Sequence, residues 1–225
     1  MTQQSKYLGR GLYTFGQAAR LLRVPVTVLR YWIGERSGFE SIIHRQLSDE
    51  HVLTFAELME LHFVKLFRDQ DLSLQAIRSA AKAASQKFGA EYPFTVQRFD
   101  TDGKTIFATL RRREQDPVLV EDLRRGQLVF PTIIRPFFKK LEYLQDGIGR
   151  FWPLKSSSRN WGRVVLDPER RFGQPLDSET GVPTESIRQA VTAGKGQDVK
   201  TVAKWFVIPV EAVKAAMKYE KSLAP

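Results

Sequence analysis

The chain contains no cysteine among its 225 residues, and this absence excludes several kinds of chemistry. Disulfide bonds, thiol catalysis and thiolate zinc sites all require that residue. Histidine is also scarce, since the sequence has only His44, His51 and His62, and their spacing does not place two of them one helical turn apart as metal ligands. No segment approaches the roughly 20 apolar residues that span a bilayer. The first residues lack the apolar core of a secretory signal. We therefore expect no metal, no cofactor and no membrane partner, and a cytoplasmic, nucleoid-associated protein.

The sequence gives only weak evidence for catalytic residues. Asp100 and Asp102 could be ligands of Mg²⁺, but next to Gly103 they are more typical of a hairpin turn. The glycines do not have the spacing of a loop that binds phosphate groups. The sequence therefore predicts no enzyme and no catalytic residue.

The charge of the chain points to a polyanionic partner. Its net charge is +10 and its pI is about 9.9. Residues 10–45 hold six basic residues against two acidic ones, whereas the other residues up to 90 are balanced. An excess of one sign is expected where a protein binds phosphates. The six basic residues are Arg10, Arg20, Arg23, Arg30, Arg36 and Arg45.

Residues 13–32 predict two short amphipathic helices joined by a tight turn. Thr14 can cap the first helix, and Gln17 stands where it completes a capping box. Pro25 suits the first position of the second helix, where its missing N–H would have had no partner. This pattern predicts a helix-turn-helix, and the alternative is a helical hairpin that packs against the rest of the protein.

The second helix has an apolar side and a polar side. Val28, Leu29 and Trp32 form the side that we expect to be buried. This leaves Thr27, Arg30 and Tyr31 to face outward, as a helix in a DNA major groove requires. The expected DNA contacts are Thr14, Gln17, Arg23, Val26, Thr27, Arg30, Tyr31 and Arg45.

The rest of the chain is expected to be mainly α with a β-containing middle. Residues 38–53 predict an extended wing that carries Arg45. Alternation of apolar residues over 92–110 predicts a β-hairpin around Asp100-Thr101-Asp102-Gly103. Residues 118–129 predict a strand and a short helix, and residues 132–144 predict a helix interrupted or kinked near Pro136. The expected domains are a DNA-binding domain over 1–90, a middle region over 91–160 that contains a β-hairpin and a linker, and a small helical domain over 161–225.

The C-terminal helices repeat the N-terminal pair. The segment from Thr14 (TFGQAARLLRVPVTVLRYW) aligns without a gap with the segment from Asp198 (DVKTVAKWFVIPVEAVKAA). The shared positions are those that a helix-turn-helix needs for its core and its turn. Thr27 is replaced by Glu211 and Arg23 by Val207, and a carboxylate would repel phosphate. We therefore expect a degenerate helix-turn-helix that binds protein, with chance similarity as the alternative.

The N-terminal residues resemble the DNA-binding head of MerR-type regulators. The resemblance rests on Tyr-Thr-x-Gly at 13–16, Val-x-Val at 24–26 and Leu-Arg-Tyr at 29–31. It implies that Thr14, Arg30 and Tyr31 anchor phosphates, and that the outward side of the second helix, with Val26 and Thr27, reads bases. The long coiled coil of that family is replaced here by the β-containing middle, which argues against a sensor of small molecules.

The C-terminal residues are similar to a small helical domain of VapB-type antitoxins, which are encoded beside PIN-like ribonuclease toxins. The motifs are Asp-Pro at 167–168, Gly-Gln-Pro at 173–175 and Gly-Val-Pro-Thr at 181–184. Together the resemblances imply a DNA-binding antitoxin that neutralises its toxin and represses its own operon, with operator DNA, the toxin and a second copy of the chain as partners. Trp205 and Tyr219 are the expected contacts with a partner protein. The alternatives are a stand-alone MerR-like regulator and a protein-binding adaptor with weak affinity for DNA.

Overall fold

The structure is a computed structural model that describes residues 10–35, 40–47, 50–144, 147–155, 162–193 and 198–223. The chain divides into two compact units. The N-terminal unit comprises Thr14–Lys139 and Tyr143–Ile148. The C-terminal unit comprises Met1–Tyr13, Lys140–Glu142 and Gly149–Pro225. The three-domain division expected from the sequence stays a prediction.

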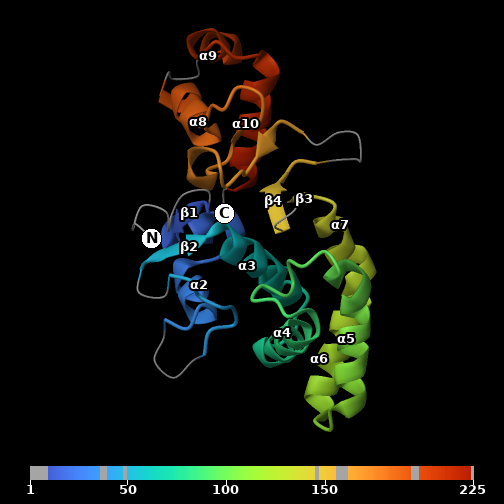
Figure 1. The fold of residues 1–225 in the computed structure, drawn as a ribbon. Helices are drawn as coiled ribbons and strands as arrows, with labels where there is room; N and C mark the ends of the chain where they lie inside the picture. The colour runs from blue at the N-terminus through green and yellow to red at the C-terminus, as the bar shows by residue number, and fades with distance from the viewer. Residues whose placement is uncertain are drawn as a thin grey trace. The chain divides into compact units, whose positions relative to one another are not determined.

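Helices dominate both units, which confirms a mainly α fold with small β elements (Figure 1). Each described strand belongs to a two-stranded sheet. The helices are α1 (Phe15–Leu22), α2 (Val26–Trp32), α3 (Phe55–Arg68), α4 (Leu74–Phe88), α5 (Phe99–Arg113), α6 (Pro117–Val129), the π-helix η2 (Phe130–Ile134), α7 (Arg135–Phe138), the 3₁₀-helix η3 (Arg171–Gly173), α8 (Thr184–Ala193), α9 (Val199–Phe206) and α10 (Val210–Ser222). The strands are β1 (Leu12–Thr14), β2 (Val52–Thr54), β3 (Leu141–Leu144), β4 (Gly147–Phe151), β5 (Val164–Val165) and β6 (Leu176–Asp177).

An aromatic core holds the N-terminal unit together. Phe63 of α3 is fully buried, and its ring lies 4.9 Å from that of Phe137 and 5.0 Å from that of Phe138. The ring of Phe99 lies 5.0 Å from that of Phe94, at the start of α5. Edge and tilted ring contacts of this kind add to the free energy gained by burying the rings. The core therefore joins α3, α5 and α7.

The expected hairpin over 92–110 is wrong, because the structure has helix α5 there. Phe99, Gly103 and Phe107 are buried and stand four residues apart. Their buried positions therefore follow the period of a helix and not that of a strand. Gly103 is needed for close packing rather than for a turn. A Cβ atom at Gly103 would lie 2.2 Å from Cζ of Phe130.

Two further expectations need correction. Residues 118–129, expected to be a strand and a short helix, are all within α6. The helix expected over 132–144 ends at Phe138, and Leu141–Leu144 form β3 instead. Pro136 lies in the short α7, directly after the π-helix, so the predicted interruption near this proline is present.

A buried carboxyl group fixes the segment that leads into α5. The side chain of Glu60 accepts hydrogen bonds from the backbone N–H groups of Phe94 and Thr95, each at 3.0 Å. Burial raises the pKa of Glu60 to about 8, although the two N–H donors act in the opposite direction. The contact joins α3 to a segment 34 residues later in the chain.

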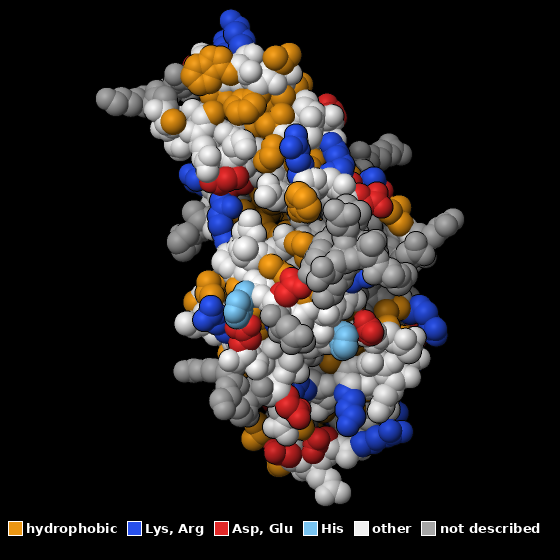
Figure 2. Space-filling model, turned by 60° about the vertical axis from the view of Figure 1, so that its left-hand side comes forward, with side chains coloured by type: hydrophobic (Ala, Val, Ile, Leu, Met, Phe, Trp, Pro, Cys, Tyr) orange, Lys and Arg blue, Asp and Glu red, His pale blue; other side chains and the backbone are white. Residues whose placement is uncertain are grey.

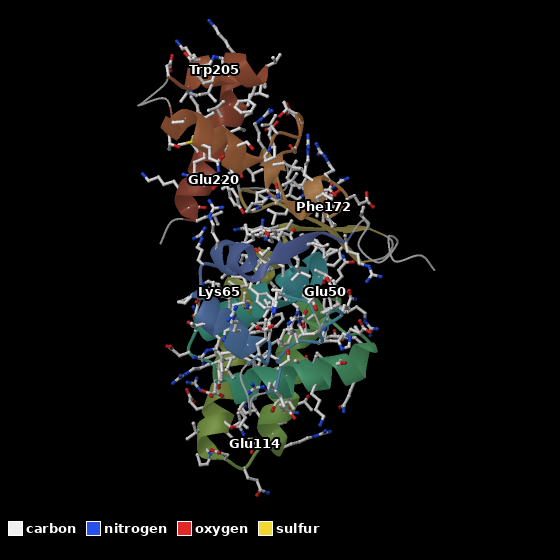
Figure 3. All side chains as sticks on the ribbon, turned by 90° about the vertical axis from the view of Figure 1, so that its left-hand side faces the viewer. Glu50, Lys65, Glu114, Phe172, Trp205 and Glu220 are labelled. Carbon is white, nitrogen blue, oxygen red and sulfur yellow. The ribbon has the colours of Figure 1, made fainter. Side chains whose placement is uncertain are left out.

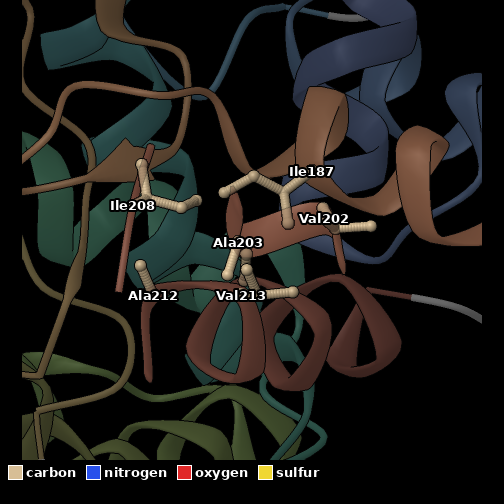
Figure 4. Close-up of a cluster of buried hydrophobic side chains, with 7 residues drawn as sticks. Ile187, Val202, Ala203, Ile208, Ala212 and Val213 are labelled. Atoms are coloured by element: carbon tan, nitrogen blue, oxygen red, sulfur yellow. The ribbon is translucent and has the colours of Figure 1, made fainter. Parts of the chain in front are cut away.

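The C-terminal unit has a separate small core formed by α8, α9 and α10 (Figure 4). Ile187, Val202 and Val213 are fully buried in it. The hydroxyl group of Thr184 donates to the buried carboxylate of Glu220 and so ties the start of α8 to the end of α10. The hydrophobic contacts set the packing of the three helices, and this polar contact adds a specific link between two of their ends.

The structure confirms the second helix-turn-helix-like unit. Arg23 after α1 and Val207 after α9 both adopt the left-handed backbone conformation. Arg23 has φ of 55° and ψ of 48°, and Val207 has φ of 55° and ψ of 47°. Val24 N–H donates to Ala19 at 3.0 Å, and the matching bond from Ile208 to Ala203 is 2.9 Å. Pro25 and Pro209 then precede α2 and α10 with similar dihedral angles. The aligned sequences therefore adopt the same turn.

Replacement of Gly103 by alanine should destabilise the N-terminal unit. The added methyl group meets the buried ring of Phe130, so we expect the free energy of unfolding to fall by about 1–3 kcal/mol. Gly16→Ala is the matched control, because a Cβ atom at that helical position meets nothing within 4 Å. This change should raise the free energy of unfolding by up to about 1 kcal/mol. Equal effects of the two changes in urea unfolding would contradict the packing described for α5.

Candidate nucleic-acid interface

The first turn of the helix-turn-helix is fixed by the predicted capping box. The Thr14 hydroxyl oxygen accepts from Gln17 N–H at 3.2 Å, and Thr14 N–H donates to Gln17 Oε1 at 2.9 Å. Both side chains are exposed. These bonds satisfy backbone donors that would otherwise lack a partner at the start of α1, and they hold the two polar side chains at the surface.

Helix α2 shows its polar side to solvent, as the sequence predicts. Leu29 and Trp32 are buried, while Thr27 and Arg30 are exposed and Val26 is 37% exposed. Tyr31 is half-buried at the edge of this face. The arrangement leaves short polar, cationic and apolar groups on one exposed side of α2, which is what readout of base edges requires.

Arginines of the turn and of α1 add positive charge beside α2. Arg23 is exposed at the left-handed position, and Arg20 is exposed in the last turn of α1. Arg20 was not among the residues expected to contact DNA. The signal in the sequence was its position three residues after Gln17, which places both side chains on one face of α1.

Arg30 is held only weakly by the protein. Its Nε lies 3.8 Å from an oxygen of Glu35, and its side chain is 55% exposed. Its guanidinium carbon lies 6.0 Å from the centre of the Phe15 ring. An exposed ion pair of this length contributes little to stability, so a phosphate can replace Glu35 as the partner of Arg30.

Arg45 does not point to solvent, contrary to the role in DNA binding expected for it. Its side chain is 8% exposed, and its Nε lies 3.4 Å from the fully buried Glu57. Its Nη2 also donates to the backbone oxygens of Leu47, Glu50 and Val52. Arg45 therefore holds the loop before α3 in place, and it is left out of the proposed interface.

The expected wing over 38–53 is present only in part. Residues 40–47 form bends and turns, and the described strand of this region is β2, which starts at Val52. Residues 36–39, 48 and 49 lie outside the described residues. Within the described part, β2 pairs with β1, and Arg45 donates to the backbone oxygens of Leu47, Glu50 and Val52.

The two residues expected to contact a partner protein differ in exposure. Trp205 is 59% exposed and lies at the end of the C-terminal helical unit (Figure 3). Tyr219 is only 3% exposed, so its expected role in partner binding is corrected to one in the core. Trp205 alone remains a candidate contact.

No group of three or more acidic or histidine side chains that could hold a metal ion is found in the described residues. Asp102 forms an ion pair with Lys87 at 2.7 Å, and the hydrogen bond from this lysine lowers the pKa of the aspartate. Asp100 lies 3.6 Å from Arg135. Cations of the protein therefore already pair with both of the aspartates that were considered as Mg²⁺ ligands.

Comparison with known proteins identifies the N-terminal region. Residues 13–84 match the MerR HTH family regulatory protein. This region is a MerR-type helix-turn-helix domain. We call it the MerR-type head, and it holds the exposed polar and cationic residues of α1, α2 and their turn described above.

The likeness extends beyond the MerR-type head. A Mycobacterium tuberculosis protein named "Putative antitoxin VapB45" is 24% identical over 205 residues, which are 81% of this chain and 83% of the relative. The crystal structure of Rv2018 from the same organism has a TM-score of 0.72 and 20% identity, covering 93% of this chain and 98% of that one. The resemblance to a VapB-type antitoxin with a MerR-type head is therefore confirmed, and it supports a DNA-binding antitoxin or regulator. Within the described residues, no helix has the length and apolar character to cross a membrane.

Removal of the Arg45 side chain should reduce stability rather than act on DNA directly. Arg45→Ala leaves the buried Glu57 without its cationic partner, and we expect the free energy of unfolding to fall by about 3 kcal/mol. Arg135→Ala is the control, because it breaks an exposed ion pair worth at most about 1 kcal/mol. Urea unfolding measures both values. If Arg45→Ala left the stability unchanged and weakened DNA binding, the result would contradict this account. It would support the phosphate contact that the sequence predicted for Arg45.

Proposed function

We propose that this chain is a DNA-binding antitoxin that neutralises a PIN-like ribonuclease toxin and represses its own operon. The exposed side of α2, where Thr27 and Arg30 face solvent over a buried apolar side, is the observation that carries the proposal. Phosphates would contact Arg20, Arg23 and Arg30, and base edges would meet Val26 and Thr27. The local excess of basic residues supports an electrostatic contribution to this binding.

Thr14, Gln17 and Tyr31 complete the proposed interface. The hydroxyl group of Thr14 and the amide of Gln17 lie at the start of α1, where polar groups can contact the backbone of the duplex. The half-buried Tyr31 can present its hydroxyl group at the edge of the same face. We further propose a homodimer, because paired heads read half-sites one helical turn apart on DNA.

The exposed Trp205 supports a protein partner. A stand-alone regulator has no need for a large apolar side chain at the surface of a second helical unit, whereas an antitoxin or an adaptor does. The antitoxin and adaptor hypotheses differ in the strength of DNA binding, so the measurements on the MerR-type head separate them.

Arg30→Ala should weaken binding to the DNA upstream of the chain's own reading frame. If Arg30 neutralises one phosphate, the slope of log affinity against log salt becomes shallower by about one unit, on all sequences alike. Arg135→Ala is the matched control, because the side chain of Arg135 is 54% exposed, that of Arg30 is 55% exposed, and each forms an exposed ion pair. The control should leave the slope unchanged. Equal effects of the two changes in mobility-shift titrations would contradict the assignment.

Thr27→Ala should change sequence preference rather than overall affinity. A side chain that contacts base edges contributes discrimination of about 1–3 kcal/mol per base pair, while phosphate contacts contribute none directly. Glu211→Ala, the same position of the second helix-turn-helix-like unit, should leave preference unchanged. Selection from a random DNA pool measures preference for both variants. Loss of the same factor on every sequence in Thr27→Ala would reassign Thr27 to the DNA backbone.

A further inference from the structure

The second helix-turn-helix-like unit exposes apolar side chains at the turn where the MerR-type head exposes arginine. Val207 replaces Arg23 and is 88% exposed. Trp205 replaces Leu21 and is 59% exposed, whereas Leu21 is 8% exposed. Figure 2 shows hydrophobic side chains gathered at this end of the C-terminal unit. The same backbone therefore carries a different surface, and we call Trp205 and Val207 the turn patch.

The turn patch is not explained by the folding of its own unit. Neither Trp205 nor Val207 belongs to the cluster of buried hydrophobic residues that packs α8, α9 and α10 together. Val207 is also β-branched and left-handed, with φ of 55°. A β-branched side chain is strained in that conformation, and exposure to water gives it no compensating burial. The sequence thus keeps an unfavourable residue at an exposed turn, as expected where binding rather than folding requires it.

The charges around the turn patch indicate the chemistry of its partner. On α9 and the first turns of α10 the exposed charged residues are Lys200, Lys204, Lys214 and Glu211, and the exposed Asp198 caps α9, so three basic residues stand against two acidic ones. Basic residues beside an apolar patch contribute mainly to the rate of association with an acidic surface and to specificity for it. A second copy of this chain would oppose lysine to lysine, so the charges disfavour self-association through this patch.

DNA is the less favoured occupant of the turn patch. The position that matches Thr27 carries Glu211, whose carboxylate repels phosphate. Val207 offers no hydrogen bond to the DNA backbone, and Trp205 offers only its indole N–H. The lysines could contact phosphates, and the experiment below therefore measures DNA binding as well.

We propose that the turn patch is the docking site for the toxin, through an acidic toxin surface with an apolar pocket that receives Trp205 and Val207. This inference rests on the proposed antitoxin function and names the part of the chain that holds the toxin. Trp205 is the anchor, since large aromatic side chains in desolvated pockets contribute most of the binding energy of an interface. The MerR-type head stays available for DNA, so one chain binds toxin and operator through two copies of one motif.

The test is binding of the full-length chain to the nuclease encoded by the neighbouring reading frame. Trp205→Ala should weaken toxin binding more than tenfold, and wild-type affinity should fall as salt is raised. Phe172→Ala is the matched control: Phe172 is a 66% exposed aromatic residue of the same unit and lies away from Trp205 (Figure 3). The Phe172→Ala variant should bind the toxin with the same affinity as the wild type.

Val207→Asn separates binding from folding. Asparagine tolerates the left-handed conformation better than valine, so the melting temperature should stay equal or rise. The apolar contact is lost, so toxin binding should weaken severalfold in this well-folded variant. Operator affinity should be unchanged in both turn-patch variants.

Three outcomes would overturn the proposal. If both turn-patch variants bind toxin as the wild type does, the toxin docks elsewhere and the proposed antitoxin function stands. If the wild type does not bind the nuclease, the antitoxin function and the docking site fall together. If Trp205→Ala and Val207→Asn lose operator affinity instead, the turn patch is a nucleic-acid contact.

Discussion

One left-handed residue between α1 and α2 determines which side chains the MerR-type head shows to solvent. Arg23 adopts φ of 55°, and its N–H and that of Val24 bond back to the end of α1. The chain then turns sharply into Pro25, whose ring fixes its φ directly before α2 begins at Val26. Leu29 and Trp32 can face inward only with this turn in place. The exposure of Thr27 and Arg30, and with it the proposed DNA contact, depends on the same turn.

The C-terminal unit uses the same turn for a different surface. Val207 matches Arg23 in both dihedral angles, so the backbone does not decide what the unit binds. The groups that differ are those that point outward, where cationic and hydroxyl side chains give way to apolar side chains and a carboxylate. A helix-turn-helix core constrains its buried positions strongly and its exposed positions weakly, which leaves the exposed positions open to change.

Local signals in the sequence were sufficient for both helix-turn-helix units. Caps, prolines and helical spacing act within a few residues, and they gave the turn and the outward side of α2 correctly. Long-range packing was not accessible in this way. Gly103 follows an aspartate as in a hairpin, but the ring of Phe130 decides its role. Arg45 looked available for phosphate because its partner Glu57 lies twelve residues later and is itself buried. Tyr219 lies three residues after the buried Ala216 on the same face of α10, which is a local sign of core packing that the sequence interpretation missed.

A cleavage experiment tests the central claim that the MerR-type head contacts DNA and its degenerate copy does not. Because the chain has no cysteine, Thr27→Cys and Glu211→Cys each give a single thiol that can carry an iron–EDTA reagent. Both positions are exposed and equivalent in the two helix-turn-helix units. We predict cleavage of operator DNA at defined bases from position 27 and none above background from position 211. Cleavage from position 211, or equal cleavage from the two positions, would contradict the account.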